Sequence, residues 1–178
     1  MTREDFELFT AMPLAFETIG LERSNAWEPY FCTPEGAELV GAIGCDGVHF
    51  VLLPGDERVF CVDPAMGEPG TYVLPVGEDF RAFLSYILFC RNANPLSQIW
   101  WMQEPQFRAL LEEDARAAWP GCEEYLAEQK RTLETVAKAF ALVPVGPFGR
   151  VKAMQAAFDP EGLHFSDAYY DVLGIERD

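Results

Sequence analysis

The residues best suited to chemistry fall in one short stretch, GCDGVHFVLLPGDERVFCVDP, at residues 44–64. It holds Cys45, Asp46, His49 and Cys61 within seventeen positions, and His49 is one of only two histidines. Two kinds of site would use them. A Cys45–His49 pair would form a nucleophilic dyad, in which a nearby imidazolium lowers the pKa of the thiol. Two thiols and an imidazole would form part of a zinc site.

The spacing argues against both kinds of site. Cys45 and His49 are four residues apart, which brings side chains together on a helix but separates them by roughly 13 Å on a strand. Val48–Leu53 and Arg58–Val62 are rich in β-branched and aromatic residues and flank a four-residue turn at Pro54–Glu57. This pattern predicts a β-hairpin. A structural zinc site also needs four clustered ligands, which the sequence does not offer.

The predicted hairpin has a defined pairing. If Phe50 lies opposite Cys61, His49 lies opposite Val62, and both faces of the strand pair are largely apolar. Strands with two apolar faces belong in the middle of a covered sheet. A slip of one residue would exchange the two faces, so the pairing is a specific prediction.

The rest of the chain carries no recognised catalytic signature. It contains no Gly-x-Gly-x-x-Gly, Walker, Gly-x-Ser-x-Gly or His-Glu-x-x-His motif. Adjacent acids such as Glu112 and Glu113 are frequent, but neighbouring carboxylates point apart, and acid–base catalysis needs a carboxyl in an apolar pocket. We therefore expect no enzymatic activity, no catalytic or cofactor-binding residues, no cofactor and no metal site.

Cysteine usage and hydropathy indicate a reduced, soluble, cytoplasmic protein. The five cysteines are odd in number and set in apolar stretches, whereas disulfide frameworks favour even counts in short secreted chains. The N-terminal MTREDFELFT has neither the basic nor the apolar segment of an export signal. The longest apolar run, near residues 83–90, is far shorter than the roughly 20 residues that span a bilayer.

The chain is strongly acidic. Thirteen basic and twenty-nine acidic residues give a net charge of −16, and residues 1–60 alone hold eleven acidic and three basic side chains. Such a surface repels nucleic acid and anionic lipid, which proteins hold chiefly through Lys and Arg. It attracts a basic protein partner, although an acidic balance also serves solubility alone. The oligomeric state does not follow from the charge.

The length of 178 residues suits one domain, and the element pattern predicts an α+β fold. We expect a mixed or mostly antiparallel sheet covered by helices, with a helical C-terminal region. Besides the hairpin, short strands are expected at residues 27–33, 37–43 and 72–76, where β-branched and aromatic residues stand between turn signals.

Helices are expected around these strands. Thr2 is placed to cap an N-terminal helix, and Asp79–Arg91 carries the apolar stripe of a core-facing helix after an acidic start. Pro105 and Pro120 stand where prolines are common, in the first turn of a helix. Ser166 is placed to cap a last short helix.

The order of these elements resembles the SUKH superfamily, which groups fungal regulators of cell-wall synthesis with bacterial immunity proteins of toxin systems. The resemblance rests on CDGVHFVLLP, the return strand RVFCVDP and the run YVLPVGEDFRAFLSYIL. The family's strand ending in aspartate, its proline-valine strand and its helix match Val59–Asp63, Leu74–Val76 and Asp79–Leu84. The similarity covers about residues 20–100, and an acidic pair replaces the usual serine before the helix.

The length favours a single domain over residues 1–178. Within it, the resemblance implies a SUKH-like core at about 1–100, and the helical C-terminal extension at about 103–178 goes beyond the family core. The resemblance implies protein binding rather than catalysis. In its sharpest form, the protein would be an immunity protein that neutralises a basic, nuclease-type toxin, because complementary charge speeds association.

For such a partner, the candidate contact residues are Asp56 and Glu57 in the hairpin loop and Trp101, one of two adjacent tryptophans that cannot both face one core. Two alternatives remain open. A small-molecule-binding protein or an enzyme would use a pocket near Cys45 and His49. A regulatory adaptor with no toxin link would present the same acidic surface as an immunity protein.

Overall fold

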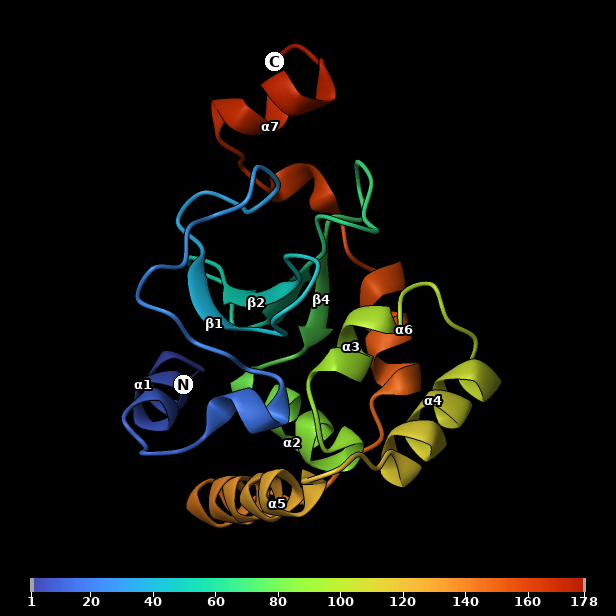
Figure 1. Ribbon diagram of the computed structural model, residues 1–178. Coiled ribbons are helices and arrows are strands. Elements are labelled where there is room, and N and C mark those ends of the chain that lie inside the picture. The colour runs from blue at the N-terminus through green and yellow to red at the C-terminus, as the bar shows by residue number, and fades with distance from the viewer. Residues whose placement is uncertain (1, 178) are drawn as a thin grey trace.

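Four short strands pair into one antiparallel sheet, with helical segments on both of its sides (Figure 1). The computed structural model describes residues 2–177. In sequence order, which is also the order across the sheet, the strands are β1 Glu38–Ala42, β2 His49–Leu52, β3 Val59–Val62 and β4 Val73–Gly77. The helices are α1 Thr2–Thr10, η1 Phe16–Ile19, α2 Phe80–Cys90, α3 Asn94–Gln98, α4 Glu104–Arg116, α5 Cys122–Ala139, α6 Phe148–Ala156, η2 Pro160–Gly162 and α7 Asp167–Leu173.

This architecture confirms the predicted α+β fold with a helical C-terminal region. Every neighbouring pair of strands in the sheet is antiparallel. Within residues 2–177, no helix combines the length and the apolar character needed to cross a lipid bilayer.

The hairpin of β2 and β3 has the predicted register. Phe50 lies opposite Cys61, and His49 lies opposite Val62. Every residue of both strands is buried, as expected for central strands that are covered on two faces. Side chains alternate between the faces of a sheet, so Phe50 and Cys61 share one face while His49 and Val62 share the other.

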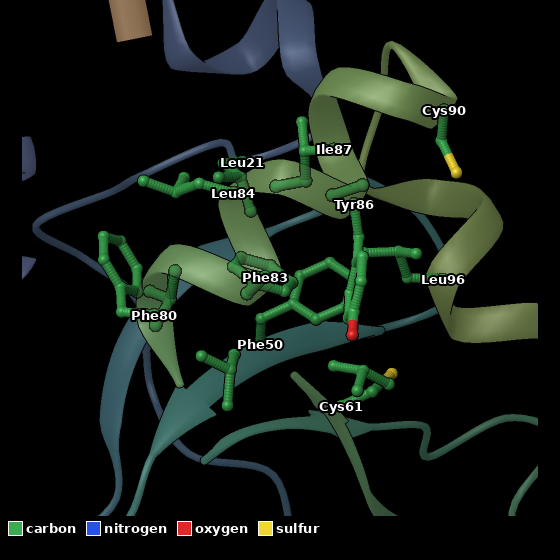
Figure 2. Packing of buried hydrophobic residues seen from close by; sticks show 14 of the residues in the cluster. Leu21, Phe50, Cys61, Phe80, Phe83, Leu84, Tyr86, Ile87, Cys90 and Leu96 are labelled. Carbon is green, nitrogen blue, oxygen red and sulfur yellow. The ribbon is translucent and has the colours of Figure 1, made fainter. Parts of the chain in front are cut away.

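The first face of the sheet packs against helices. Figure 2 shows the apolar side chains of α2 gathered over Phe50 and Cys61, and the rings of Phe50 and Phe83 lie 5.2 Å apart. The helix starts where the sequence predicts, because the Asp79 carboxylate accepts the N–H of Ala82 at 2.7 Å. On the far side of α2, α5 adds further apolar side chains to the same core.

The second face is covered by loops and by the C-terminal segment of residues 158–173, which ends in α7 (Figure 1). Phe165 and Tyr169 stack at 4.1 Å and belong to the same cluster as Phe60 of the sheet. Ser166 occupies the N-cap position of α7, as expected, but its side chain makes no capping hydrogen bond. The C-terminal segment therefore helps to bury this face of the sheet.

The strand expected at residues 27–33 is wrong, because this segment forms an irregular loop and a turn. Thr33 closes the turn: its backbone N–H donates to the Tyr30 carbonyl, and its hydroxyl accepts the Tyr30 N–H, both at 2.9 Å. Pro29 and Pro34 also lack the N–H groups that a strand ladder requires. The aromatic residues in the segment are used for packing and not for sheet pairing.

Thr2 lies inside α1 and does not cap it, which corrects a second expectation. The Thr2 hydroxyl donates to the backbone carbonyl of Glu57 at 2.8 Å and accepts the N–H of Phe80 at 3.2 Å. Its own N–H donates to the Glu57 carboxylate at 2.8 Å. A single residue thus joins α1, the loop between β2 and β3, and the start of α2.

Candidate functional site

His49 is fully buried, and both of its ring nitrogens are bonded inside the protein. Nδ1 lies 2.7 Å from the carbonyl oxygen of Gly47, and Nε2 lies 3.1 Å from the hydroxyl of Thr33. A carbonyl can only accept, so Nδ1 carries the proton and Nε2 accepts from Thr33. Burial lowers the pKa of His49, which favours this neutral form. The imidazole therefore has no free nitrogen with which to activate Cys45.

The thiols are dispersed and not gathered into one site. Cys45 is exposed on the turn between β1 and β2, whereas Cys61 is buried on the face of the sheet opposite to His49. Burial raises the pKa of Cys61 well above its usual range and that of Cys32 to about 12, which keeps both protonated at neutral pH. Within residues 2–177, no three His, Cys, Asp or Glu side chains are grouped to hold a metal ion.

A pocket of about 370 Å³ does lie beside Cys45, between the loop of residues 22–30 and the turn that joins β1 to β2. We call it the aromatic pocket. The side chains and backbone that matter for its chemistry are those of Glu22, Trp27, Tyr30, Cys45, Asp46 and Gly47.

The two aromatic side chains of this pocket are supported by His49. Tyr30 stacks on the imidazole with ring centroids 5.5 Å apart, and Trp27 meets it edge-on at 5.4 Å. The Tyr30 N–H also donates to the Thr33 hydroxyl, which in turn donates to His49. Because the other nitrogen of His49 binds Gly47, the buried histidine connects the two walls of the pocket.

The turn between β1 and β2 has the backbone geometry needed to approach Tyr30. Gly44, Asp46 and Gly47 have φ angles of 84°, 54° and 71°, a region that favours glycine and is tolerated by aspartate. A Cβ atom at Gly47 would lie 2.7 Å from the Tyr30 ring. Only glycine therefore allows the ring to lie this close to the turn.

Two acidic side chains, Glu22 and Asp46, line the aromatic pocket, and no lysine or arginine is among its described lining residues. Glu22 is held beside it because its backbone pairs with Ala42 through two hydrogen bonds of 2.8 Å. Asp46 reaches it from the turn. The nearest cation in sequence, Arg23, instead lies 5.4 Å from the ring centroid of Phe6. The pocket thus combines aromatic rings with two carboxylates, and no ion pair of either carboxylate is found among residues 2–177.

Asp56 and Glu57, the predicted contact residues of the hairpin loop, both make bonds within the chain. Asp56 is half-buried and accepts from Arg58 Nε at 3.0 Å and Nη2 at 2.6 Å. Burial opposes ionisation of Asp56, but the bonds from Arg58 outweigh it and lower the pKa of this carboxyl. Hydrogen bonds from Thr2 lower the pKa of Glu57, which stays exposed. A role for either carboxylate in partner binding stays a prediction.

Trp101, the third predicted contact residue, is exposed in the segment between α3 and α4. Its neighbour Trp100 is half-buried, so only one of the two adjacent tryptophans faces solvent, as expected. Within residues 2–177, no hydrogen bond, ion pair or ring contact joins Trp101 to Asp56 or Glu57. A role for Trp101 in partner binding stays a prediction.

A larger hollow of about 910 Å³, which we call the helical groove, lies between α2, α4 and α5. Phe89, Trp119 and Leu126 line it and are exposed, and Leu111 and Leu133 add partly buried apolar surface. Exposed aromatic and aliphatic side chains around a groove are typical of protein-binding surfaces. The apolar pattern of a helix does not show which of its residues lack a covering neighbour, so sequence reasoning missed this groove.

Comparisons with known proteins leave the family open, because no protein-family model, curated protein or solved structure matches this chain. The resemblance to the SUKH superfamily thus stays a prediction that rests on the quoted residues. The function must be argued from the charges, hollows and bonds of this chain.

Proposed function

We propose that this chain is a non-enzymatic module that binds a basic protein partner. The observation that supports this proposal is that most of its basic side chains form ion pairs within the chain. At least nine of the thirteen lie within 4.0 Å of a carboxylate of the same chain. The sequence holds twenty acidic residues beyond the nine carboxylates in those pairs.

This distribution favours one class of partner. Once most cations are neutralised locally, the acidic excess produces a negative potential that attracts basic proteins and raises their association rate. The same potential opposes binding to nucleic acid and anionic membranes. Charge steers association, whereas buried aromatic contacts supply most of the affinity of a typical interface. The helical groove and the aromatic pocket offer such contacts.

The sharpest form of the proposal is a cytoplasmic immunity protein that occludes a basic, nuclease-type toxin. The SUKH resemblance supports this form, and the step from fold to immunity is an analogy. A regulatory adaptor without a toxin link would use the same acidic surface. The activity of the bound partner separates these two roles.

A small-molecule-binding protein or an enzyme is the second candidate, and the aromatic pocket beside Cys45 is the feature that favours it. The bonding of His49 weighs against a thiol enzyme, because a nucleophilic cysteine needs a nearby base or cation. The proposal of protein binding is therefore the stronger one.

Affinity capture tests the proposal. The purified chain is immobilised, exposed to lysate of its source cells at about 0.15 M salt and then washed at about 1 M, where the Debye length falls from about 8 Å to about 3 Å. We expect one basic protein, retained in stoichiometric amount, to be released by the high salt. A column carrying an unrelated protein of similar net charge is the control.

The retained protein then decides between the roles. Inhibition of a nuclease activity by stoichiometric amounts of this chain would support immunity, and a partner without toxic activity would support the adaptor. Retention of an acidic partner, or of the same proteins on the control column, would contradict the proposal.

A further inference from the structure

The aromatic pocket has the composition of a cation-binding site. The faces of Trp and Tyr rings carry negative potential and attract cations, and Tyr30 is 44% exposed. Glu22 and Asp46 line the same hollow, and no cation lines it among the described residues. A positive group entering the pocket would meet aromatic side chains and carboxylates together.

We propose that the aromatic pocket binds an arginine side chain of the basic partner. In this arrangement the guanidinium lies against Trp27 or Tyr30 and donates to the carboxylate of Glu22 or Asp46. The inference rests on the proposed function, because it takes the partner to be a basic protein. It adds the residue type that the partner inserts and the place where it binds.

Arginine fits these walls better than lysine does. A guanidinium is planar, stacks on aromatic rings and donates to carboxylates through a rigid fork of N–H groups, whereas an ammonium is compact and strongly hydrated. A volume of about 370 Å³ is near the lower end for ligand pockets, so it suits one long side chain. Arginine is also enriched among the residues that dominate protein interfaces.

The walls of the pocket are fixed by the protein before any ligand binds. The hydrogen bonds of His49 to Gly47 and Thr33 hold the turn and the loop together, and its ring supports Trp27 and Tyr30. A binding site that is already ordered loses less conformational entropy on association. Burial keeps His49 neutral by lowering its pKa, so no positive charge lies behind the aromatic rings.

The structure offers variants that remove the charge and preserve the walls. Asp46 has a φ of 54°, which asparagine also tolerates, so Asp46→Asn retains the turn. Glu22 holds its position through backbone bonds to Ala42, so Glu22→Gln retains the pairing with β1. Glu68→Gln is the matched control, because Glu68 is exposed and does not line the pocket.

NMR titration of the full chain with N-acetyl-arginine amide tests the site directly. We expect the amide resonances of residues 22–30 and 44–48 to shift. The citrulline analogue has nearly the same shape without the charge, and we expect it to bind at least about threefold more weakly. The lysine analogue should also bind more weakly than the arginine analogue. The double variant Glu22→Gln, Asp46→Asn should bind the arginine analogue about tenfold more weakly, while Glu68→Gln binds as the parent does.

Equal binding of arginine and citrulline, unchanged binding by the double variant, or shifts located elsewhere would overturn the inference. Amide spectra and thermal unfolding of each variant confirm that it is folded. A second arm measures the affinity of the captured partner for each variant. We expect this affinity to be lower for the double variant than for the parent chain and to be unchanged for Glu68→Gln.

The two proposals fail in different ways. If the parent chain and the double variant hold a basic partner equally well, the arginine site is wrong and the proposed function stands. If the parent chain binds the arginine analogue but retains no basic protein, the cation-binding chemistry stands and the proposed function is wrong.

Discussion

At the scale of single residues, His49 couples the stability of the fold to pH. Its pKa is lowered in the folded protein, so below the ordinary value of about 6.5 the unfolded chain takes up a proton more readily than the folded one. The free energy of unfolding should therefore decrease as pH falls from about 6.5 towards the folded pKa. For one group, this slope cannot exceed about 1.4 kcal/mol per pH unit.

Urea unfolding at pH 7.5, 6.5 and 5.5 measures this slope in the parent chain and in His49→Gln. The variant loses hydrogen bonds and ring packing, so it should be less stable at every pH, but its pH dependence should be shallower. His164→Gln is the control, because His164 is exposed. An identical slope in the parent chain and in His49→Gln would show that His49 does not titrate differently in the two states.

At the scale of elements, Thr2 joins α1, the β2–β3 loop and α2 through one buried hydroxyl. Thr2→Val keeps the shape of the side chain but leaves the Phe80 N–H without its acceptor and the Glu57 carbonyl without this donor. An unsatisfied buried polar group costs about 1–3 kcal/mol. We expect a loss of that size in the free energy of unfolding, measured by denaturant titration.

Thr10→Val is the matched control for this prediction, because Thr10 lies at the other end of α1 and its hydroxyl donates within the helix, to the Glu7 carbonyl. It should change stability by less than about 0.5 kcal/mol. Thr2→Ser retains the hydroxyl and should recover most of the loss. Equal losses in Thr2→Val and Thr10→Val would mean that the contact between the elements contributes little.

Elements whose pattern is local were predictable from the sequence. The β2–β3 hairpin combines strands rich in β-branched residues with a turn, which allowed its register to be predicted. The helix α2 combines an N-terminal aspartate with an apolar stripe, which allowed its start to be predicted. The helices α3 and α6 were not foreseen. Asn94–Pro95 resembles a helix stop but begins α3, and α6 follows a loop rich in proline and glycine, with little of its own length buried.

Some features of the candidate sites could not be predicted, because they depend on contacts between residues that lie far apart in the sequence. Trp27 and Tyr30 look like strand residues, but a hydrogen bond from Thr33 to a histidine sixteen positions away places them around a pocket. Glu57 looks like a free loop carboxylate, but it binds Thr2, 55 positions earlier in the chain. Such pairings depend on tertiary packing, which a local pattern does not encode.

At the scale of the whole molecule, charge and apolar contacts should act on different steps of partner binding. The acidic excess acts at long range and is screened by salt, so removing it should mainly slow association. Apolar residues that become buried should mainly control dissociation. The two exposed tryptophans of the helical part, Trp101 and Trp119, allow the position of the apolar contact to be tested.

Trp119 and Trp101 are 47% and 44% exposed, so they form a matched pair, and only Trp119 lines the helical groove. If the groove is the apolar contact, Trp119→Ala should weaken binding of the captured partner by about tenfold or more, mainly through faster dissociation at both salt concentrations. Trp119 also meets Tyr125 edge-on at 5.5 Å, so thermal unfolding must first show that the variant is folded. A larger loss for Trp101→Ala would instead place the contact on the segment between α3 and α4. That result would favour the residue predicted from sequence and exclude the groove as the main anchor.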